Sequence, residues 1–264
     1  MLRISRSIGI AVALVLVCFQ IGAQTPTPSK GPPVRVLLIG NSQIRYLYDA
    51  GEMLEKLAAS TSPTVDLEAV ESIRWSSSLK TNWDDGRAIP TGPFDFVVIQ
   101  DTLGFSRINK NIAAEFMDYG SRIDKWAKEQ GGRTVFWMEQ TYTPPSPDEL
   151  SIADRERINS DLARKLHADV APIGLAWERA WQERPDLLLY AQDGAHPNVA
   201  GTYLMACVLY ATILKKSPVG LKYQAQGVSP FGLAELRSTD ASYLQHVAWR
   251  TCLAYEFAHV GMQE

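Results

Sequence analysis

Short apolar segments rich in β-branched residues alternate along this chain with segments of helical periodicity, and this alternation constrains the fold more than any other feature. Strands are expected at 34–39, 64–70, 94–99, 134–138 and 168–173, and helices at 46–59, 112–130, 148–167, 176–183, 197–215 and within 233–258. Such alternation favours crossover connections and a mostly parallel sheet with helices on both faces. Because neither a repeat nor an internal linker is visible, we predict a single α/β domain over residues 34–264.

The N-terminal residues have the composition of a targeting segment followed by a tether. Arg3 and Arg6 precede an apolar stretch that is short for a membrane span. This layout predicts a secretory signal peptide over residues 1–23, followed by a proline-rich tether over residues 24–33. We therefore expect an exported protein, periplasmic or secreted, without a stable membrane span. An uncleaved anchor and a lipoprotein with Cys18 as the lipid acceptor are the less favoured alternatives.

Charge and cysteine content exclude several classes of function. The 264 residues include 26 basic and 29 acidic ones, a formal net charge of -3. Removal of residues 1–23 takes away two arginines and no acid, which leaves 24 basic against 29 acidic residues, a net of -5. An acidic domain is not expected to bind nucleic acid through counterion release. The remaining Cys207 and Cys252 fall in helical patterns, which favours buried thiols over a disulfide.

Functional side chains in such a sheet follow the carboxyl ends of the strands. Ser42 follows the first expected strand directly after Gly40 and Asn41. Free backbone N–H groups of a strand-to-helix turn could stabilise an oxyanion there. Taken alone, however, a serine at this position is more often a simple turn or N-cap residue.

Asp193 and His196, which lie in the stretch Asp-Gly-Ala-His-Pro, favour a catalytic role for Ser42 over a role as a turn or N-cap residue. A spacing of three residues allows a tight turn to bring the carboxylate to one ring nitrogen, which leaves the other nitrogen free to face a nucleophile. Gly194 gives the turn its conformational freedom, and Pro197 is suited to begin the next helix. The alternative is an N-cap aspartate beside a surface histidine. Ser42, Asp193 and His196 together predict a catalytic triad.

At these two blocks the chain resembles the SGNH/GDSL hydrolases, over residues 34–221. Ile39-Gly40-Asn41-Ser42 is similar to their nucleophile block, and Asp193 to Pro197 is similar to their Asp-x-x-His-Pro block. The resemblance looks closest to a bacterial branch of exported members, with similar segments at 83–86, 94–100 and 201–212. It implies a three-layer α/β/α sandwich with a five-stranded parallel sheet, like that of flavodoxin. It also implies hydrolysis of esters, often acetyl groups on carbohydrate, with neither a metal nor another cofactor.

The resemblance also assigns roles residue by residue. Ser42 matches the nucleophile, His196 the general base and Asp193 the acid that orients it. The oxyanion donors are matched by the N–H groups of Ser42 and Ser76 and by the side-chain amide of Gln100. Two of these depart from the family pattern, since Ser76 stands where the family has glycine and Gln100 where it has asparagine.

Four further residues near the strand ends are candidates for contact with substrate. They are Asn41, Trp75, Glu139 and Gln140. Trp75 could belong to a sugar-binding wall or equally to the core. We expect a serine esterase that acts on a small-molecule or glycan ester. A carbohydrate-binding protein with an altered oxyanion hole, or an acyltransferase, are the alternatives.

Overall fold

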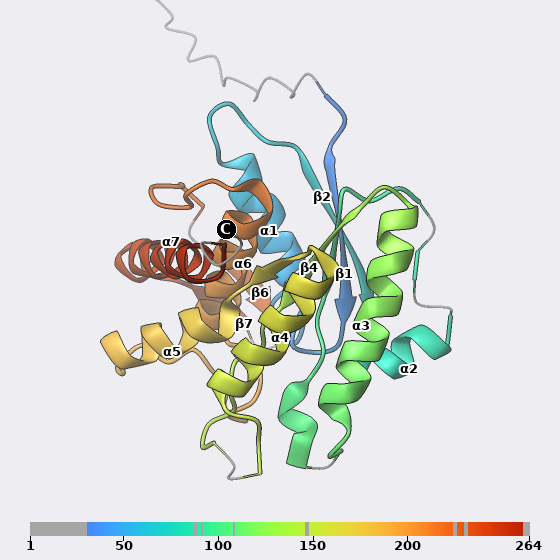
Figure 1. Ribbon diagram of the computed structural model, residues 1–264. Helices are drawn as coiled ribbons and strands as arrows, with labels where there is room; N and C mark the ends of the chain where they lie inside the picture. Colours follow the sequence, from blue (N-terminus) through green and yellow to red (C-terminus); the bar gives the residue numbers. More distant parts are fainter. Residues whose placement is uncertain are drawn as a thin grey trace, which may run out of the picture.

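A five-stranded parallel sheet forms the centre of the molecule (Figure 1). The computed structural model describes residues 31–86, 89–90, 92–107, 109–145, 148–223, 226–229 and 232–260. The strands are β1 (Val34–Gly40), β2 (Leu67–Ile73), β3 (Phe96–Ile99), β4 (Arg133–Trp137) and β5 (Asp169–Ala171), in the order β2-β1-β3-β4-β5. The predicted fold class is therefore confirmed. The predicted signal segment and most of the predicted tether lie outside the described residues.

Two layers of helices cover the sheet, one on each face. One layer contains α1 (Ala50–Ala59), α5 (Ile173–Glu183), α6 (Val199–Leu214) and α7 (Ser238–Val260), and the other contains α2 (Leu79–Asp84), α3 (Ile112–Glu129) and α4 (Ile152–Leu166). A hydrophobic core lies on each face of the sheet, and β1 contributes side chains to both because side chains alternate between the two faces of a strand. Val36 and Leu38 pack in the first core, and Leu37 and Ile39 pack in the second.

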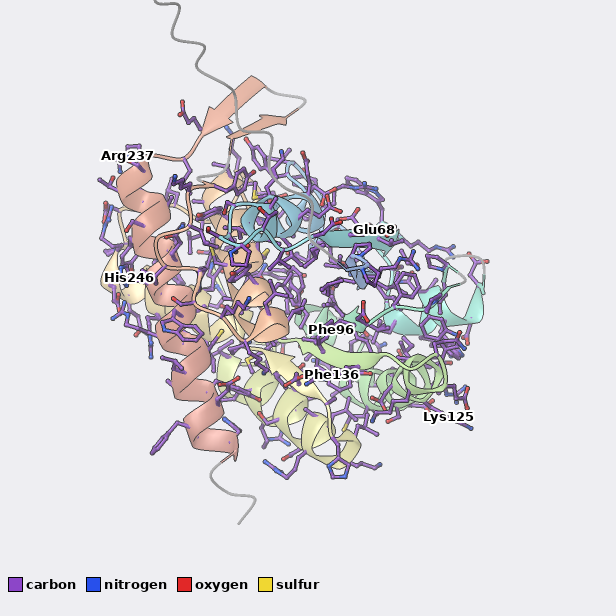
Figure 2. The ribbon with its side chains drawn as sticks, turned by 90° about the horizontal axis from the view of Figure 1, so that it is seen from above. Glu68, Phe96, Lys125, Phe136, Arg237 and His246 are labelled. Carbon is purple, nitrogen blue, oxygen red and sulfur yellow. The ribbon has the colours of Figure 1, made fainter. Side chains whose placement is uncertain are left out.

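Helix α6 lies at the centre of its layer and is buried along nearly its whole length. This burial suits its sequence, since a helix that is apolar all round must be enclosed by protein. Asn198 is its N-cap, and the Asn198 side chain accepts bonds of 2.9 and 3.0 Å from the N–H groups of Ala200 and Gly201. Cys207 on α6 and Cys252 on α7 are both buried and unpaired, as predicted. Viewed from above, α7 runs along the outer edge of the molecule, with Arg237 at its start and His246 along its length (Figure 2).

Several elements differ from those expected. Helix α1 begins at Ala50 instead of residue 46, because the Asp49 side chain caps it by accepting a 2.9 Å bond from the Glu52 N–H. Strand β2 lies three residues further along the chain than expected. The sequence did not predict α2, the short 3-10 helix η1 (Leu103–Arg107), or the antiparallel pair β6 (Gln226–Ser229) and β7 (Gly232–Glu235).

Candidate active site

Ser42 lies in a tight turn that follows the carboxyl end of β1. Gly40 ends this strand, and a Cβ there would lie 2.3 Å from Oε1 of Gln100. Glycine permits this close approach, and the Asn41 N–H then donates to Gln100 Oε1 over 2.9 Å. The Gly40 carbonyl accepts a 3.0 Å bond from the side chain of Asn82 on α2. Buried polar partners therefore hold the backbone of the nucleophile turn.

His196 lies on the loop between α5 and α6. Its carbonyl accepts a 2.8 Å bond from the Ala191 N–H. Asp193 Oδ1 accepts 2.9 Å bonds from the N–H groups of Ala195 and His196, and Asp193 Oδ2 lies 2.7 Å from His196 Nδ1. Partial burial raises the pKa of Asp193, but the backbone N–H groups of His196 and Ala195 and the imidazole of His196 together outweigh it, so the pKa lies below its usual value. The ionised carboxylate can therefore orient the imidazole.

The imidazole of His196 faces Ser42 across 154 residues of chain. His196 Nε2 and Ser42 Oγ are 2.9 Å apart. When Nδ1–H donates to Asp193, Nε2 carries the lone pair and accepts the hydrogen of the serine hydroxyl. The structure thus brings the three residues of the predicted triad into one series of hydrogen bonds. This arrangement can move a proton off a serine hydroxyl.

Gly194, between the acid and the base, docks the loop against the segment that follows β4. Its φ of +68° is in the left-handed region, and a Cβ there would lie 2.1 Å from the carbonyl oxygen of Thr143. The Gly194 carbonyl also accepts a 2.8 Å bond from the Thr143 N–H. The two backbones therefore meet at a distance that only glycine permits.

Tyr46 covers the imidazole of His196. The two rings are stacked, with centroids 3.9 Å apart and an interplanar angle of 16°. Trp75 lies beside Tyr46, with the two ring centroids 5.9 Å apart. Of the Trp75 surface, 57% is exposed. Sequence reasoning missed Tyr46 because it was assigned to the first helix. Trp75, by contrast, is not a core residue.

Two further loops converge on the nucleophile turn. The Asn41 side-chain N–H₂ donates to the carbonyl of Ser77 over 2.9 Å and to the hydroxyl of Thr102. Ser76, in the first of these loops, has a φ of +53°, the left-handed conformation that glycine adopts most easily. Asn41 therefore binds protein groups and joins three loops, and it also lines the cavity, so the predicted contact with substrate stays a prediction.

Gln100 lies behind the nucleophile turn. Its side chain is fully buried, its Oε1 accepts from the Asn41 N–H, and it is absent from the residues that line the cavity. Thr102, two residues further on, does line the cavity and has a hydroxyl group to donate. Through its Oε1, Gln100 supports the backbone of the nucleophile turn, and the role of its amide nitrogen as an oxyanion donor stays a prediction.

Glu139 and Gln140 are absent from the residues that line the cavity, which corrects their predicted contact with substrate. Both side chains are fully buried. Glu139 pairs with Arg155 over 2.7 Å and accepts a 3.2 Å bond from the Gly104 N–H. Burial raises the pKa of Glu139 to about 8, although Arg155 and the Gly104 N–H act in the opposite direction.

A cavity of about 400 Å³ opens over Ser42 at the carboxyl edge of the sheet. Its walls come from the nucleophile turn, the loops after β2, β3 and β4, and the loop of His196. The lining residues are Asn41, Ser42, Gln43, Ser76, Thr102, Tyr142, Thr143, Pro144, Asp193, Gly194, Ala195 and His196. Within the described ranges, no three His, Cys, Asp or Glu side chains group as metal ligands would. No helix in that part of the chain has the length and apolar character to cross a bilayer.

No protein-family model and no curated protein matches the sequence significantly. A solved structure of a putative SGNH hydrolase from Slackia heliotrinireducens is 21% identical, with a TM-score of 0.56 over 69% of this chain and 100% of that one. A DUF4886 family protein from Bacteroides uniformis ATCC 8492 is 14% identical, with a TM-score of 0.63 over 84% of this chain and 95% of that one. An acetyl xylan esterase, AlAXEase, is 13% identical, with a TM-score of 0.56 over 67% of this chain and 98% of that one.

These similarities confirm, at the level of the fold, the resemblance that the two sequence blocks indicated. The chain has the α/β fold of the SGNH hydrolases, with its five-stranded parallel sheet. The sequence identities are low, so these similarities establish the fold and do not establish an activity.

Proposed function

We propose that this protein is a serine ester hydrolase. The observation that carries the proposal is the series of hydrogen bonds from Asp193 through His196 to Ser42, at 2.7 and 2.9 Å, on the wall of an open cavity. Nucleophile, base and orienting acid at these separations are the arrangement that acyl transfer through a serine requires.

The reaction would proceed in two halves. Ser42 Oγ attacks the acyl carbon while His196 Nε2 takes the hydroxyl proton, and Asp193 stabilises the imidazolium. The imidazolium then protonates the leaving alcohol as the ester C–O bond breaks, which leaves an acyl group on Ser42. Water attacks this acyl group, gives a proton to His196, and the carboxylic acid leaves as Ser42 regains its proton.

The oxyanion of each tetrahedral intermediate needs donors aimed at one point. We assign this role to the N–H groups of Ser42 and Ser76 and the hydroxyl of Thr102, all of which belong to residues on the cavity wall. Thr102 accepts a bond from Asn41, so its own proton can point elsewhere. A single well-placed donor contributes about 3 kcal/mol to the lowering of the barrier.

The substrate we propose is a small acyl ester, most plainly an acetyl ester, of a carbohydrate. Because His196 must protonate the leaving oxygen, the alcohol part of the ester lies beside the His196 ring. Tyr46 stacks on that ring and Trp75 stands exposed beyond it. Aromatic faces beside a polar cleft suit the apolar face of a sugar. The shared fold with an acetyl xylan esterase is consistent with this choice.

The test is to compare wild-type protein with the Ser42→Ala variant on p-nitrophenyl acetate, on p-nitrophenyl esters of longer chain, and on acetylated xylan. We expect hydrolysis by the wild type, preference for acetyl, and loss of turnover in the variant. A fluorophosphonate probe should label the wild type and leave Ser42→Ala unlabelled. Equal rates for the two proteins would contradict the proposal, and a preference for long chains would contradict the substrate class.

The same experiment tests two alternative functions. A binding protein without turnover would be favoured by a Ser42 hydroxyl out of reach of His196, and the 2.9 Å separation argues against it. An acyltransferase would release p-nitrophenol but form an acylated sugar when an acceptor is added. We further propose that the enzyme acts outside the cytoplasm, on the basis of the predicted signal peptide over residues 1–23, in which Arg3 and Arg6 precede the apolar stretch.

A further inference from the structure

Gln43 follows the proposed nucleophile in the chain, and its side chain joins two loops. Its Nε2 donates to the carbonyl of Ala195 over 3.3 Å, and its Oε1 accepts from Nε2 of Gln140 over 2.9 Å. Ala195 immediately precedes His196. The amide of Gln43 therefore links the nucleophile turn, the loop of the acid and base, and the segment that follows β4.

The chemistry of these groups sets the direction of both bonds. The Ala195 carbonyl can only accept, so the N–H₂ end of Gln43 must face it. The oxygen end then faces Gln140, which must donate. Gln43 and Gln140 are buried, at 3% and 0% exposure, so removal of either bond would leave a buried polar group without that partner.

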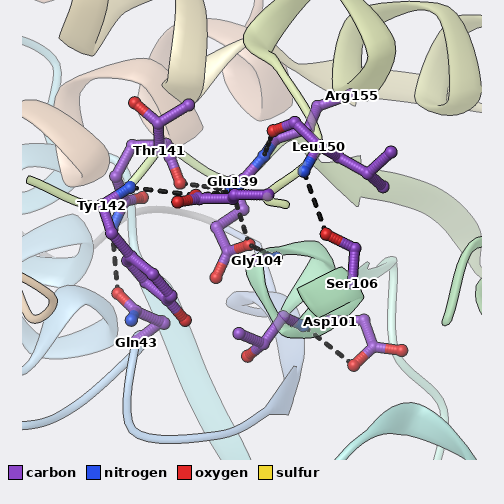
Figure 3. Close-up of polar contacts among 12 residues, drawn as sticks. Gln43, Asp101, Gly104, Ser106, Glu139, Thr141, Tyr142, Leu150 and Arg155 are labelled. Atoms are coloured by element: carbon purple, nitrogen blue, oxygen red, sulfur yellow. Dashed lines mark hydrogen bonds and ion pairs between the residues drawn. The ribbon is translucent and has the colours of Figure 1, made fainter. Parts of the chain in front are cut away.

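A buried polar network surrounds Arg155 on α4 (Figure 3), and it includes the backbone carbonyl of Gln140. The Arg155 guanidinium is fully buried and donates to the Gln140 carbonyl and to the carboxylates of Glu139 and Glu149. Glu149 in turn accepts a 3.0 Å bond from the Tyr142 N–H. A buried arginine with this many acceptors is costly to disturb, so the segment 139–142 offers Gln43 a rigid support.

We propose that Gln43 is a positioning residue that holds the loop carrying Asp193 and His196 at the distance from Ser42 that proton transfer requires. The Thr143 N–H to Gly194 carbonyl bond fixes one point of that loop, and Gln43 fixes a second point at Ala195. Two fixed points set both the place and the orientation of the segment that bears the imidazole. This inference rests on the proposed function.

The test compares Gln43→Leu, which removes both bonds without adding charge, with Gln140→Leu, which removes only the support. Gln182→Leu on the exposed face of α5 is the matched control. We expect kcat to fall about tenfold to a hundredfold in Gln43→Leu, because small misplacement of a catalytic group has effects of that size. We expect a smaller fall in Gln140→Leu, with KM changed by less than about twofold in both, and no change in the control.

A spectroscopic readout separates positioning from a general structural role. The proton shared by His196 Nδ1 and Asp193 should give a downfield NMR signal in the wild type and in Gln182→Leu, and should broaden or vanish in Gln43→Leu. If Gln43→Leu keeps both this signal and the wild-type rate of fluorophosphonate labelling, the inference is wrong. If Gln43→Leu does not fold, Gln43→Met, which also removes both bonds without adding charge and keeps the unbranched shape of the side chain, decides the question by the same readouts. A wild type that is never labelled would overturn the proposed function, while the NMR comparison would still test Gln43.

Discussion

The two halves of the site are built differently. The nucleophile turn is held by Asn41, Asn82 and Gln100, whose side chains are at most 2% exposed. The loop of the acid and base is open to solvent, since the side chains of His196 and Asp193 remain 23% and 37% exposed. The first half follows a central strand of the sheet, and the second connects two helices.

This difference indicates which half is the fixed reference. A turn that follows a central strand inherits the rigidity of the ladder, because its neighbours β2 and β3 pair with β1 on both sides. A surface loop has fewer buried contacts and depends on specific docking points. Ser42 is thus placed by the core, and His196 must be brought to it. A substitution in one half of the site can therefore be used to measure whether the other half is affected.

The largest effect is expected from Thr102→Val, in the buried half. The variant keeps the shape of the side chain and loses the hydroxyl, so kcat should fall by about 10²–10³, the usual effect of removing one oxyanion donor. KM should change little, thermal stability should fall because the buried Asn41 side chain loses an acceptor, and Thr102→Ser should keep most of the rate and of the stability. Steady-state kinetics on p-nitrophenyl acetate measure this. An unchanged kcat in Thr102→Val would mean that the hydroxyl does not meet the oxyanion.

A pair of glycine variants contrasts the two halves directly. Gly40→Ala places a Cβ against Gln100 in the core, so we expect the free energy of unfolding to fall by about 1–3 kcal/mol. Gly194→Ala places a Cβ against Thr143 in the exposed loop, so the loop should shift and activity should suffer more than stability. Urea unfolding and kcat, measured on both variants, give the comparison. Equal destabilisation by the two substitutions would refute the distinction between a fixed and an adjustable half.

The dependence of stability on pH should arise in the buried half of the site. Burial raises the pKa of Asp101 to about 7, against the opposing bonds from the backbone of Thr102 and Leu79. The folded state then binds a proton that the unfolded chain releases near its ordinary pKa of 3.8, so stability should decrease as pH rises from about 4 to 7. Asp101→Asn, which can still accept from the Thr102 N–H, should flatten this decrease. Melting temperatures at pH 5 and pH 8 measure it, and parallel curves for the two proteins would contradict it.

The smallest effect is expected from Ser76→Gly. The left-handed backbone at Ser76 costs about 1 kcal/mol or slightly more in a residue with a Cβ. Glycine removes that strain but loses more entropy on folding, so we expect a gain of up to about 1 kcal/mol in the free energy of unfolding. The N–H group remains, so kcat should stay near that of the wild type. Loss of activity in Ser76→Gly would show that the serine side chain itself acts in the site.

The sequence predicted the layers of the fold and the meeting of Ser42, Asp193 and His196. The sheet was predictable because buried strands and amphipathic helices have distinct periods. The three side chains were predictable because a glycine-flanked serine after the first strand and an Asp-x-x-His spacing each imply a local turn.

Other features depend on contacts that no local pattern records. Whether Gln100 or Thr102 reaches the cavity depends on the path of the loop after β3, and the sequence pattern of the strand does not determine that path. Arg155 lies in a run of charged residues that is typical of a solvated helix face, yet it is buried because Glu139 and Glu149 meet it from other segments. Tyr46 lies outside the helix because Asp49 caps α1 four residues later than the periodicity suggested.

The two buried thiols have a practical consequence. Burial raises the pKa of both Cys207 and Cys252, that of Cys252 to about 12. Since the thiolate is the reactive form, neither should react with an alkylating reagent until α6 and α7 separate. Apart from Cys18 in the predicted signal segment, the chain has no other cysteine. The rate of alkylation would therefore measure how fast α6 and α7 separate, without any engineered label.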